Sequence, residues 1–404
     1  MKKAVLYTLA VSALVLAGCK SQESVDAPIV MEQSSHGNAL MLKSKNKHAI
    51  ESFEKITIND YREAFIDGMA RQAARIKAIA ESIEAPTFQN TIAALDKSGD
   101  ELERAESTFY PISSSNSTQE IRDFSKEMSP LLSKHEDDIF MNQQLFQRVK
   151  KVYDEADSTK LTHEEMKTLE KIYKQFERNG ANLSEADKQR LSELNQEISA
   201  LQIEFKQNLL HETNNTYVIV DKLEDLEGLS ASDIERAEKM AVDQGQPGKW
   251  MFNMQRASCN PVLQYCKNRE LRKKVYEAYC NRGNQNNEWD NKAISAKLVK
   301  LRLERAKLMG FKNCASQILD TRMAKTPEAV YNLLDQIWTP AVKKANEELA
   351  DIREEMKKDG LTCEPEGWDY MYYSDRAKQA KYNINEEEVS EYLEINNVLQ
   401  GIFY

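Results

Sequence analysis

Hydrophobic residues along this chain recur mostly every three or four positions, which is the period of one face of an α-helix. From Ile58 to Ile83 this pattern predicts a first helix, which Pro86 ends. The same period predicts further helices over residues 92–109, 117–128, 131–153, 161–176, 184–209, 261–279, 293–309 and from 326 onward, with Pro130 separating the third from the fourth. The pattern therefore predicts a mainly α fold.

The clearest helix start is at Ser184, where Ser-Glu-Ala-Asp supplies an N-cap hydroxyl and an acid three residues later. The apolar face that follows, up to Leu209, has the spacing of a helix that packs antiparallel against a partner. The helix over residues 161–176 is the expected partner, joined to it through Arg178-Asn179-Gly180. We expect a helical hairpin in the core and not a partner-binding coiled coil.

One part of the chain breaks the helical pattern. Tyr217-Val218-Ile219-Val220 is β-branched and aromatic, and Trp250–Met254 follows the turn-forming Gln246-Pro247-Gly248. These two runs predict a small β-hairpin or sheet near residues 216–255.

Charge narrows the classes of partner. The 404 residues contain 55 Lys and Arg against 65 Asp and Glu, a formal net charge of −10. Nucleic-acid binders use a basic excess to displace counterions from phosphates. The chain lacks that excess, so we expect no nucleic-acid partner.

The first residues have the order of an export signal. Lys2 and Lys3 precede an apolar run over residues 4–17, which is too short to span a bilayer as a helix. The run ends in Leu16-Ala17-Gly18-Cys19, which resembles the lipobox of bacterial lipoproteins. We therefore predict a signal peptide over residues 1–18, lipidation of Cys19 and a flexible tether over residues 19–45. An ordinary signal peptide with an incidental cysteine is the alternative.

This start predicts an exported bacterial lipoprotein, facing the periplasm or associated with the outer membrane and held at the membrane by its lipid anchor. The remaining cysteines are Cys259, Cys266, Cys280, Cys314 and Cys363, with no Cys-x-x-Cys pair among them. For a chain of this size we expect them to be buried free thiols.

The residues alone identify no catalytic site. A zinc helix of the His-Glu-x-x-His type needs two histidines four positions apart. His135, His163 and His211 are each followed by Glu, but none has the second histidine. Nucleophile and phosphate-binding motifs are also absent from the sequence, and acidic pairs such as Asp137-Asp138 are interpreted as solvated helix faces.

A resemblance rests on several strings that occur in a fixed order between residues 50 and 404. The strings include Ala85-Pro86-Thr87-Phe88, Arg178-Asn179-Gly180-Ala181, Asn268-Arg269-Glu270-Leu271-Arg272, Glu288-Trp289-Asp290-Asn291, Met323–Glu328, Trp368–Tyr373 and Gly401-Ile402-Phe403-Tyr404. In these strings the chain resembles the M3 zinc metallopeptidases, on the branch of the peptidyl-dipeptidases (dipeptidyl carboxypeptidases) and oligopeptidase A.

The resemblance implies a helical, two-lobed architecture around a deep channel that admits short oligopeptides. Residues 46–255 then correspond to an N-terminal helical domain, and residues 256–404 to the start of the catalytic domain. Complete members of the family bind Zn²⁺ through a His-Glu-x-x-His helix and a downstream glutamate, and release dipeptides from peptide C-termini.

Each of those catalytic elements lies beyond the position that matches Tyr404. The resemblance therefore implies no catalytic residue, no metal ligand and no bound zinc in this chain, which we expect to be inactive alone and to lack a C-terminal half. The alternative is a non-catalytic helical lipoprotein that binds peptides or a protein partner.

An aromatic cluster is the candidate for contact with a peptide. Trp368, Tyr370, Tyr372 and Tyr373 fall in one string of the resemblance, where they would line the channel and offer broad apolar contact. Packing in the core is the favoured alternative.

Overall fold

The computed structural model describes residues 40, 51–384 and 386–404. The predicted signal peptide (1–18) and Cys19 lie outside these residues, and so does the predicted tether except Leu40, which is buried. The described residues from 51 onward belong to one compact unit. In this described part, no helix combines the length and the apolar character needed to cross a bilayer.

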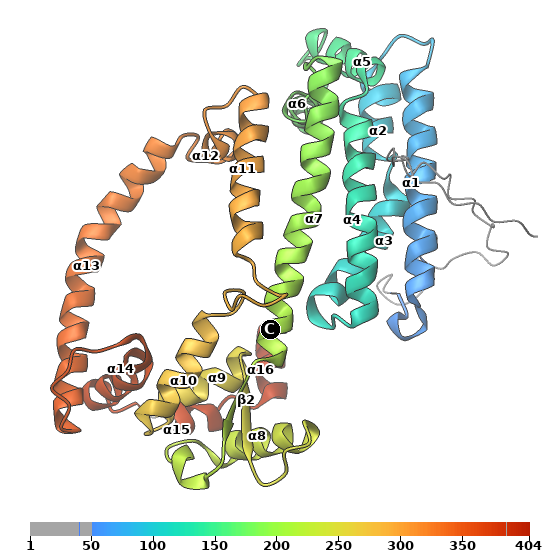
Figure 1. Cartoon of the computed structure of the whole chain (residues 1–404). Coiled ribbons are helices and arrows are strands. Elements are labelled where there is room, and N and C mark those ends of the chain that lie inside the picture. Colours follow the sequence, from blue (N-terminus) through green and yellow to red (C-terminus); the bar gives the residue numbers. More distant parts are fainter. Residues whose placement is uncertain (1–39, 41–50, 385) are drawn as a thin grey trace, which may run out of the picture. The chain divides into compact units, whose positions relative to one another are not determined.

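Helices dominate the described chain, as the hydrophobic period predicts (Figure 1). The first seven are α1 (Ile58–Ala80), α2 (Ala94–Asp96), α3 (Asp100–Ser115), α4 (Gln119–Phe140), α5 (Gln143–Asp154), α6 (His163–Arg178) and α7 (Glu185–Asn215). They are followed by α8 (Ala231–Asp243), α9 (Arg256–Tyr265), α10 (Arg269–Cys280), α11 (Lys292–Leu308), α12 (Cys314–Leu319), α13 (Pro327–Lys358), α14 (Gly367–Tyr382), α15 (Glu386–Glu391) and α16 (Ile395–Phe403). The mainly α class is confirmed.

The predicted sheet is also confirmed. Strands β1 (Tyr217–Val220) and β2 (Trp250–Asn253) pair antiparallel, with Tyr217 opposite Asn253 and Val220 opposite Trp250. Helix α8 lies in the connection between them and packs on β2. The two strands are therefore joined by a helical excursion and not by a tight turn.

Three predicted helix boundaries are wrong. The predicted span 92–109 is broken at residues 97–99, and the predicted span 261–279 is broken at residues 266–268. The third is at Pro130. Helix α4 continues through Pro130, although proline removes one backbone donor and crowds the preceding turn. The chain breaks instead at Asn142, whose side chain accepts from the backbone N–H of Leu145 and so starts α5. Packing of the apolar face of α4 thus outweighs the local cost of the proline.

The cap predicted at Ser184 is confirmed, but the expected hairpin partner is wrong. The Ser184 hydroxyl accepts from the backbone N–H of Asp187 at 3.2 Å, which starts α7. Helix α7 packs chiefly on α4 and α11 and only slightly on α6, which packs on α5 (Figure 1).

The core near the N-terminal helices is built around aromatic side chains. Phe65 of α1, Phe109 of α3 and Phe124 of α4 are buried and meet edge to face, with ring centroids 4.9–5.6 Å apart. A second buried cluster joins α5 and α6 through Phe146 and Phe176. These contacts fix the helices around the pocket described below.

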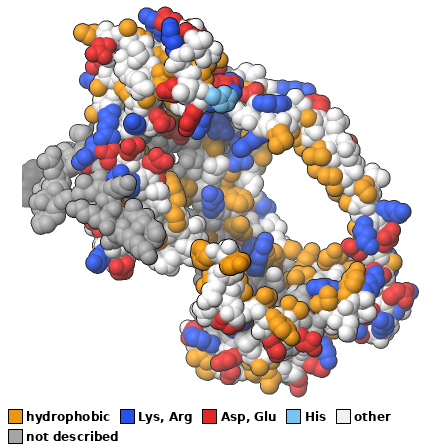
Figure 2. Space-filling view, turned by 180° about the vertical axis from the view of Figure 1, so that it is seen from behind, with side chains coloured by type: hydrophobic (Ala, Val, Ile, Leu, Met, Phe, Trp, Pro, Cys, Tyr) orange, Lys and Arg blue, Asp and Glu red, His pale blue; other side chains and the backbone are white. Residues whose placement is uncertain are grey.

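Helix α13 has an exposed apolar face. Its first half leaves large hydrophobic side chains open to solvent, and Figure 2 shows hydrophobic side chains along this helix. They are Tyr331, Leu333, Leu334, Ile337, Trp338 and Val342. Trp338 is 70% exposed, far more than a tryptophan in a closed core.

Candidate functional site

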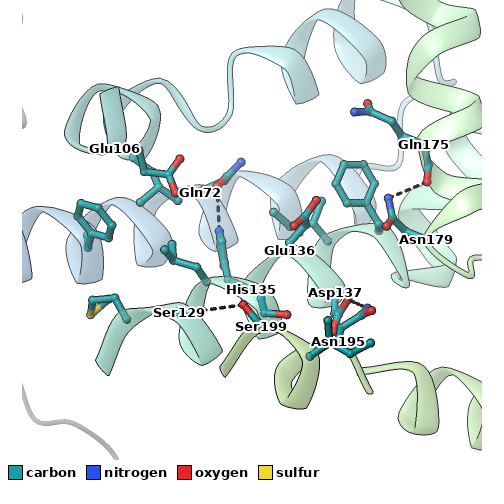
Figure 3. Close-up of a pocket in the computed structure, with 18 of the residues that line it drawn as sticks. Gln72, Glu106, Ser129, His135, Glu136, Asp137, Gln175, Asn179, Asn195 and Ser199 are labelled. Atoms are coloured by element: carbon teal, nitrogen blue, oxygen red, sulfur yellow. Dashed lines mark hydrogen bonds between the residues drawn. The ribbon is translucent and has the colours of Figure 1, made fainter. Parts of the chain in front are cut away.

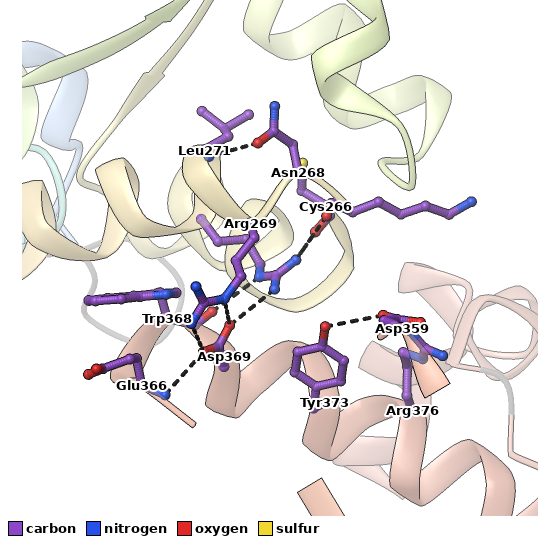
Figure 4. Close-up of polar contacts among 12 residues, drawn as sticks. Cys266, Asn268, Arg269, Leu271, Asp359, Glu366, Trp368, Asp369, Tyr373 and Arg376 are labelled. Atoms are coloured by element: carbon purple, nitrogen blue, oxygen red, sulfur yellow. Dashed lines mark hydrogen bonds and ion pairs between the residues drawn. The ribbon is translucent and has the colours of Figure 1, made fainter. Parts of the chain in front are cut away.

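A buried ion cluster joins α10 to α14 (Figure 4). The carboxylate of Asp369 is 0% exposed and accepts two hydrogen bonds from Arg269, at 2.9 and 2.6 Å, and one from Arg272 at 3.3 Å. Burial raises the pKa of Asp369, but the hydrogen bonds from Arg269, Arg272 and the backbone outweigh it, so the net pKa lies below its usual value. The carboxylate is therefore a paired, ionised structural group.

Arg272, the second cation of this cluster, is buried and makes several hydrogen bonds within the chain. Its side chain is 1% exposed, and it donates to the backbone oxygens of Cys266, Lys267 and Trp368. Its guanidinium also lies 4.1 Å from the ring centroid of Tyr372. Four of the five N–H groups of Arg272 are thus hydrogen-bonded within the chain, and the site holds two helices together.

The four aromatic candidates occupy different environments on α14. Tyr372 and Tyr373 are buried beside Arg272, Trp368 is half-buried between the cations of Arg269 and Lys273, and Tyr370 is 53% exposed. The structure therefore places Tyr372 and Tyr373 in packing contacts and Tyr370 at the surface. A channel-lining role for these residues stays a prediction.

Tyr373 also bonds to the end of α13. Its hydroxyl donates to Asp359 at 3.1 Å, and burial together with the Asp359 charge raises the pKa of Tyr373 to about 12. Arg376 pairs with the same carboxylate at 2.5 Å (Figure 4). At the start of the same helix, Gly367 lies against Tyr276, where any side chain would collide with the ring.

The described residues do not fit a zinc ion. His135, His163 and His211 belong to α4, α6 and α7, and His211 is stacked on Trp289 with ring centroids 3.8 Å apart. Within the described ranges, no group of three or more His, Cys, Asp or Glu side chains is arranged to hold a metal.

The thiols are free but only partly buried. Cys259 and Cys266 are buried, and burial raises the pKa of each. Cys314 is half-buried, whereas Cys280 and Cys363 are exposed. The prediction of free thiols is confirmed, and the prediction that all five are buried is wrong.

The main cavity of the described chain lies among the N-terminal helices (Figure 3). Its volume is about 710 Å³, and α1, α3, α4, α6, α7 and α11 contribute side chains to it. Carboxyl groups of Glu106, Glu136 and Asp137 line it together with apolar groups that include Phe109 and Met128. We call this cavity the acidic pocket.

Asp137 is the buried member of the three acids. It is 5% exposed, its Oδ1 accepts from the side-chain amide of Asn195 at 2.8 Å, and its Oδ2 is buried without a hydrogen bond. Burial raises the pKa of Asp137, against the nearby Ser192 and Asn195 side chains, which lower it. The interpretation of Asp137 as part of a solvated face is therefore wrong, because α7 covers this side of α4.

Glu106 of α3 is half-buried and Glu136 of α4 is exposed, and both line the pocket. Burial raises the pKa of both, and the charge of Glu136 raises that of Glu106 further. The other titratable groups that line the pocket are Asp96, Tyr110, His135 and Arg305.

Two of these carry partners of their own. His135 Nε2 lies 2.8 Å from Gln72 Oε1, and burial lowers the pKa of His135. Arg305 donates to Asn195 at 3.3 Å, burial lowers the pKa of Arg305, and its Nε is buried without a partner. Asn195 thus bridges the buried Asp137 and the half-buried Arg305.

Sequence patterns alone do not find the acidic pocket. Its three acids come from two helices rich in carboxylates, and nothing local separates Glu136 from Asp138, which pairs with Lys134 at the surface.

Comparison with known proteins supplies the family. The model of peptidase family M3 matches residues 262–404. The dipeptidyl carboxypeptidase of Escherichia coli is 32% identical over 370 residues, which are 91% of this chain and 54% of that protein. The corresponding Salmonella typhimurium protein is 31% identical over 91% of this chain and 54% of its own length.

Oligopeptidase A of Haemophilus influenzae is 30% identical, over 78% of this chain and 47% of that protein. The chain spans about half the length of the curated relatives it matches. The family match and the aligned regions of these relatives agree with the resemblance found in the sequence motifs between residues 50 and 404. The chain belongs to peptidase family M3, on the branch of the dipeptidyl carboxypeptidases and oligopeptidases A.

Proposed function

We propose that the chain is the N-terminal portion of an exported, lipid-anchored peptidyl-dipeptidase, which releases dipeptides from the C-termini of oligopeptides. The observation that carries this proposal is the match of 91% of the chain to a dipeptidyl carboxypeptidase. The sequence of basic residues, apolar run and Cys19 supports export and anchoring.

The chemistry implied by the family requires Zn²⁺, which would polarise the scissile carbonyl and activate a water. The described residues offer no fitting ligand set, so we assign no step to them. In this proposal the zinc site belongs to the part of the family fold that this chain does not match, and the chain alone is inactive.

The apolar face of α13 supports an interface with the remaining part of the family fold. Exposed hydrophobic groups also occur on α16, where Ile402 and Phe403 are open to solvent. Contiguous apolar surface of this kind marks a face that another polypeptide segment covers.

The deciding experiment measures peptide cleavage by the purified full chain with added Zn²⁺ and with chelator, on a peptide blocked at its N-terminus. Zinc content is measured on the same sample. We expect neither cleavage nor stoichiometric zinc. Chelator-sensitive release of dipeptides, with one zinc per chain, would contradict the assignment of the zinc site to the unmatched half.

Lipidation is tested separately, because it is independent of catalysis. Metabolic labelling with a fatty acid should label the full chain and should not label Cys19→Ser. Equal labelling of both proteins would refute the anchor, and labelling of neither would favour an ordinary signal peptide.

A further inference from the structure

Helix α13 has the sequence of a helix that packs in a core, although the structure leaves it open. Every residue from Tyr331 to Glu348 is exposed, and α13 packs chiefly on α12 at its start and on α14 at its end (Figure 1). Its apolar residues nevertheless recur at the three- and four-residue intervals of a helix face that is buried against other elements. They are Val330, Leu333, Leu334, Ile337, Trp338, Ala341, Val342 and Ala345.

Helix α16 shows the same mismatch between sequence and burial. Its apolar residues Ile395, Val398, Leu399, Ile402 and Phe403 repeat the spacing found on α13. Their exposed fractions reach 70% at Ile402 and 87% at Phe403, and no residue of α16 is buried. Two helices of the chain therefore carry apolar faces that nothing covers among the described residues.

The open apolar groups are concentrated in the part of the chain that matches the family model. Among the described residues, seven large hydrophobic side chains are exposed before residue 262, and twenty-one from residue 262 onward. The N-terminal helices bury apolar faces of the same kind, and α5, for example, buries Leu145, Phe146, Val149 and Val152. The uncovered apolar surface therefore belongs to the matched region.

The length and the charge of α13 favour a polypeptide as the group that covers it. The apolar face from Val330 to Ala345 is about 24 Å long, which is the scale of another helix. A helix that lies on a membrane surface carries many Lys and Arg residues on its polar face. The polar face of α13 has one acid and one base, and comprises Asn332, Asp335, Gln336, Thr339, Lys343 and Asn346. A lipid surface is therefore disfavoured.

The relatives indicate which polypeptide this is. The chain spans about half the length of the curated relatives it matches, so the other half of each relative has no counterpart here. We propose that α13 and α16 bind this unmatched part of an M3 chain when it is supplied as a separate polypeptide, with Trp338 at the centre of the α13 face. The inference rests on the proposed function, in which the unmatched part contains the zinc site.

The test is co-expression of the full chain with a tagged fragment of the Escherichia coli dipeptidyl carboxypeptidase that begins where its match to this chain ends. We expect the two polypeptides to co-purify as a one-to-one complex, measured by size-exclusion chromatography with light scattering. A dye that binds apolar surface should fluoresce less on the complex than on the two separate polypeptides together. Failure of the two polypeptides to associate would overturn the inference.

Variants locate the contact on each helix. Trp338→Ser should weaken the association at least about tenfold, because a tryptophan at the centre of an interface contributes strongly to binding. Lys343→Ser, on the polar face of α13, is the matched control and should leave the affinity unchanged. Ile402→Ser and Gln400→Ser give the same comparison on α16. All four side chains are exposed, so the variants should fold. Equal effects of the apolar and the control substitutions would contradict the assignment.

A second copy of this chain is the competing occupant. Light scattering of the full chain alone measures it. A monomer, or a dimer that the fragment converts into the one-to-one complex, would support the inference. A dimer that Trp338→Ser dissociates and that the fragment does not displace would overturn it, because the α13 face would then bind its own copy.

Peptide cleavage separates this inference from the proposed function. A complex that releases dipeptides from a peptide blocked at its N-terminus would support both. A complex without such cleavage would support the docking and contradict the proposed function. Absence of a complex would contradict the docking alone, because the match to the dipeptidyl carboxypeptidase, which carries the proposed function, does not depend on it.

Discussion

The two polar centres of this chain treat buried charge in opposite ways. Between α10 and α14, the carboxylate of Asp369 is matched by Arg269 and Arg272, and the donors of Arg272 end on backbone oxygens. In the acidic pocket, Glu106 and Glu136 repel each other and Asp137 keeps an oxygen without a partner.

The difference shows in the direction of the pKa shifts. Hydrogen bonds from cations hold the pKa of Asp369 below its usual value in spite of burial. In the acidic pocket, burial raises the pKa values of Glu106, Glu136 and Asp137, and the charge of Lys134 opposes this only in part at Asp137. A paired buried charge serves the fold, and an unpaired one is a reason to look for a ligand.

The largest expected effect comes from breaking the paired centre. Asp369→Asn removes the charge that compensates Arg272 and weakens the capping bond to the backbone N–H of Glu366. We expect the free energy of unfolding to fall by about 3 kcal/mol, because an uncompensated buried cation remains. Urea denaturation measures the loss.

The matched control for this change is Glu364→Gln. Glu364 pairs with Arg353 at an exposed position, where an ion pair contributes less than about 1 kcal/mol. If Asp369→Asn is no more destabilising than this control, the cluster is not the structural centre that its burial indicates.

The second prediction concerns the acidic pocket, where the pH dependence of stability has the opposite sign to that of Asp369. The pKa values of its three acids are raised in the folded chain. At pH values between the unfolded-state and the folded-state pKa values, the folded chain therefore binds more protons than the unfolded chain. Their contribution to stability is therefore present below the unfolded-state pKa values, near 4, and is lost as pH rises through the raised values. Asp369, with its lowered pKa, contributes the opposite slope.

The unmodified chain should lose stability between about pH 4 and pH 7 as these acids ionise, and Glu106→Gln/Glu136→Gln/Asp137→Asn should lose less. Relative to the unmodified chain, the free energy of unfolding of the variant should rise by on the order of 1 kcal/mol at pH 7. The measurement is the difference between the urea curves of variant and unmodified chain at each pH. The facing groups Asp96, Tyr110, His135 and Arg305 are unchanged, so they cancel in the difference. The prediction is contradicted if the stability of the variant, measured relative to the unmodified chain, is lower at pH 7 than at pH 4.

The third prediction concerns the hydroxyl of Tyr373. Tyr373→Phe keeps the ring beside Arg272 and removes the bond to Asp359, which should cost about 1 kcal/mol. Since the pKa of Tyr373 is raised from 10.0 to about 12, the folded chain keeps this proton longer, and stability falls as pH rises across that window. The fall in melting temperature at alkaline pH should therefore be smaller for Tyr373→Phe than for the unmodified chain.

Much of the fold was predictable because it depends on local signals. The cap at Ser184, the helix start at 326 and the period of the apolar faces depend on neighbouring residues, and both helix starts are confirmed. The continuation of α4 through Pro130 and the choice of α4 and α11 as partners of α7 were not predictable from local pattern. Tertiary packing decides them, and it outweighs a single proline.

The polar centres were predictable only in part. The string that contains Asn268–Arg272 and the one that contains Trp368–Tyr373 were recognised separately, but no periodic pattern pairs Asp369 with an arginine about a hundred positions earlier. In the acidic pocket, Asp137 and Asp138 are neighbours in a helix and differ only in which one α7 covers. Long-range packing, which a single sequence does not display, creates both centres.

The smallest effect on stability is expected on the exposed apolar face in the first half of α13, away from the buried Glu355 near the end of the helix. Trp338 is 70% exposed, so Trp338→Ser removes little buried area and should change the free energy of unfolding by less than about 0.5 kcal/mol. The same change should lower the fluorescence of a dye that binds apolar surface, because the exposed face of α13 loses its largest side chain. Lys344→Ser, on the same helix but polar, is the control. A large loss of stability from Trp338→Ser would mean that this face is already packed within the chain, and the interface proposed for α13 would lose its support.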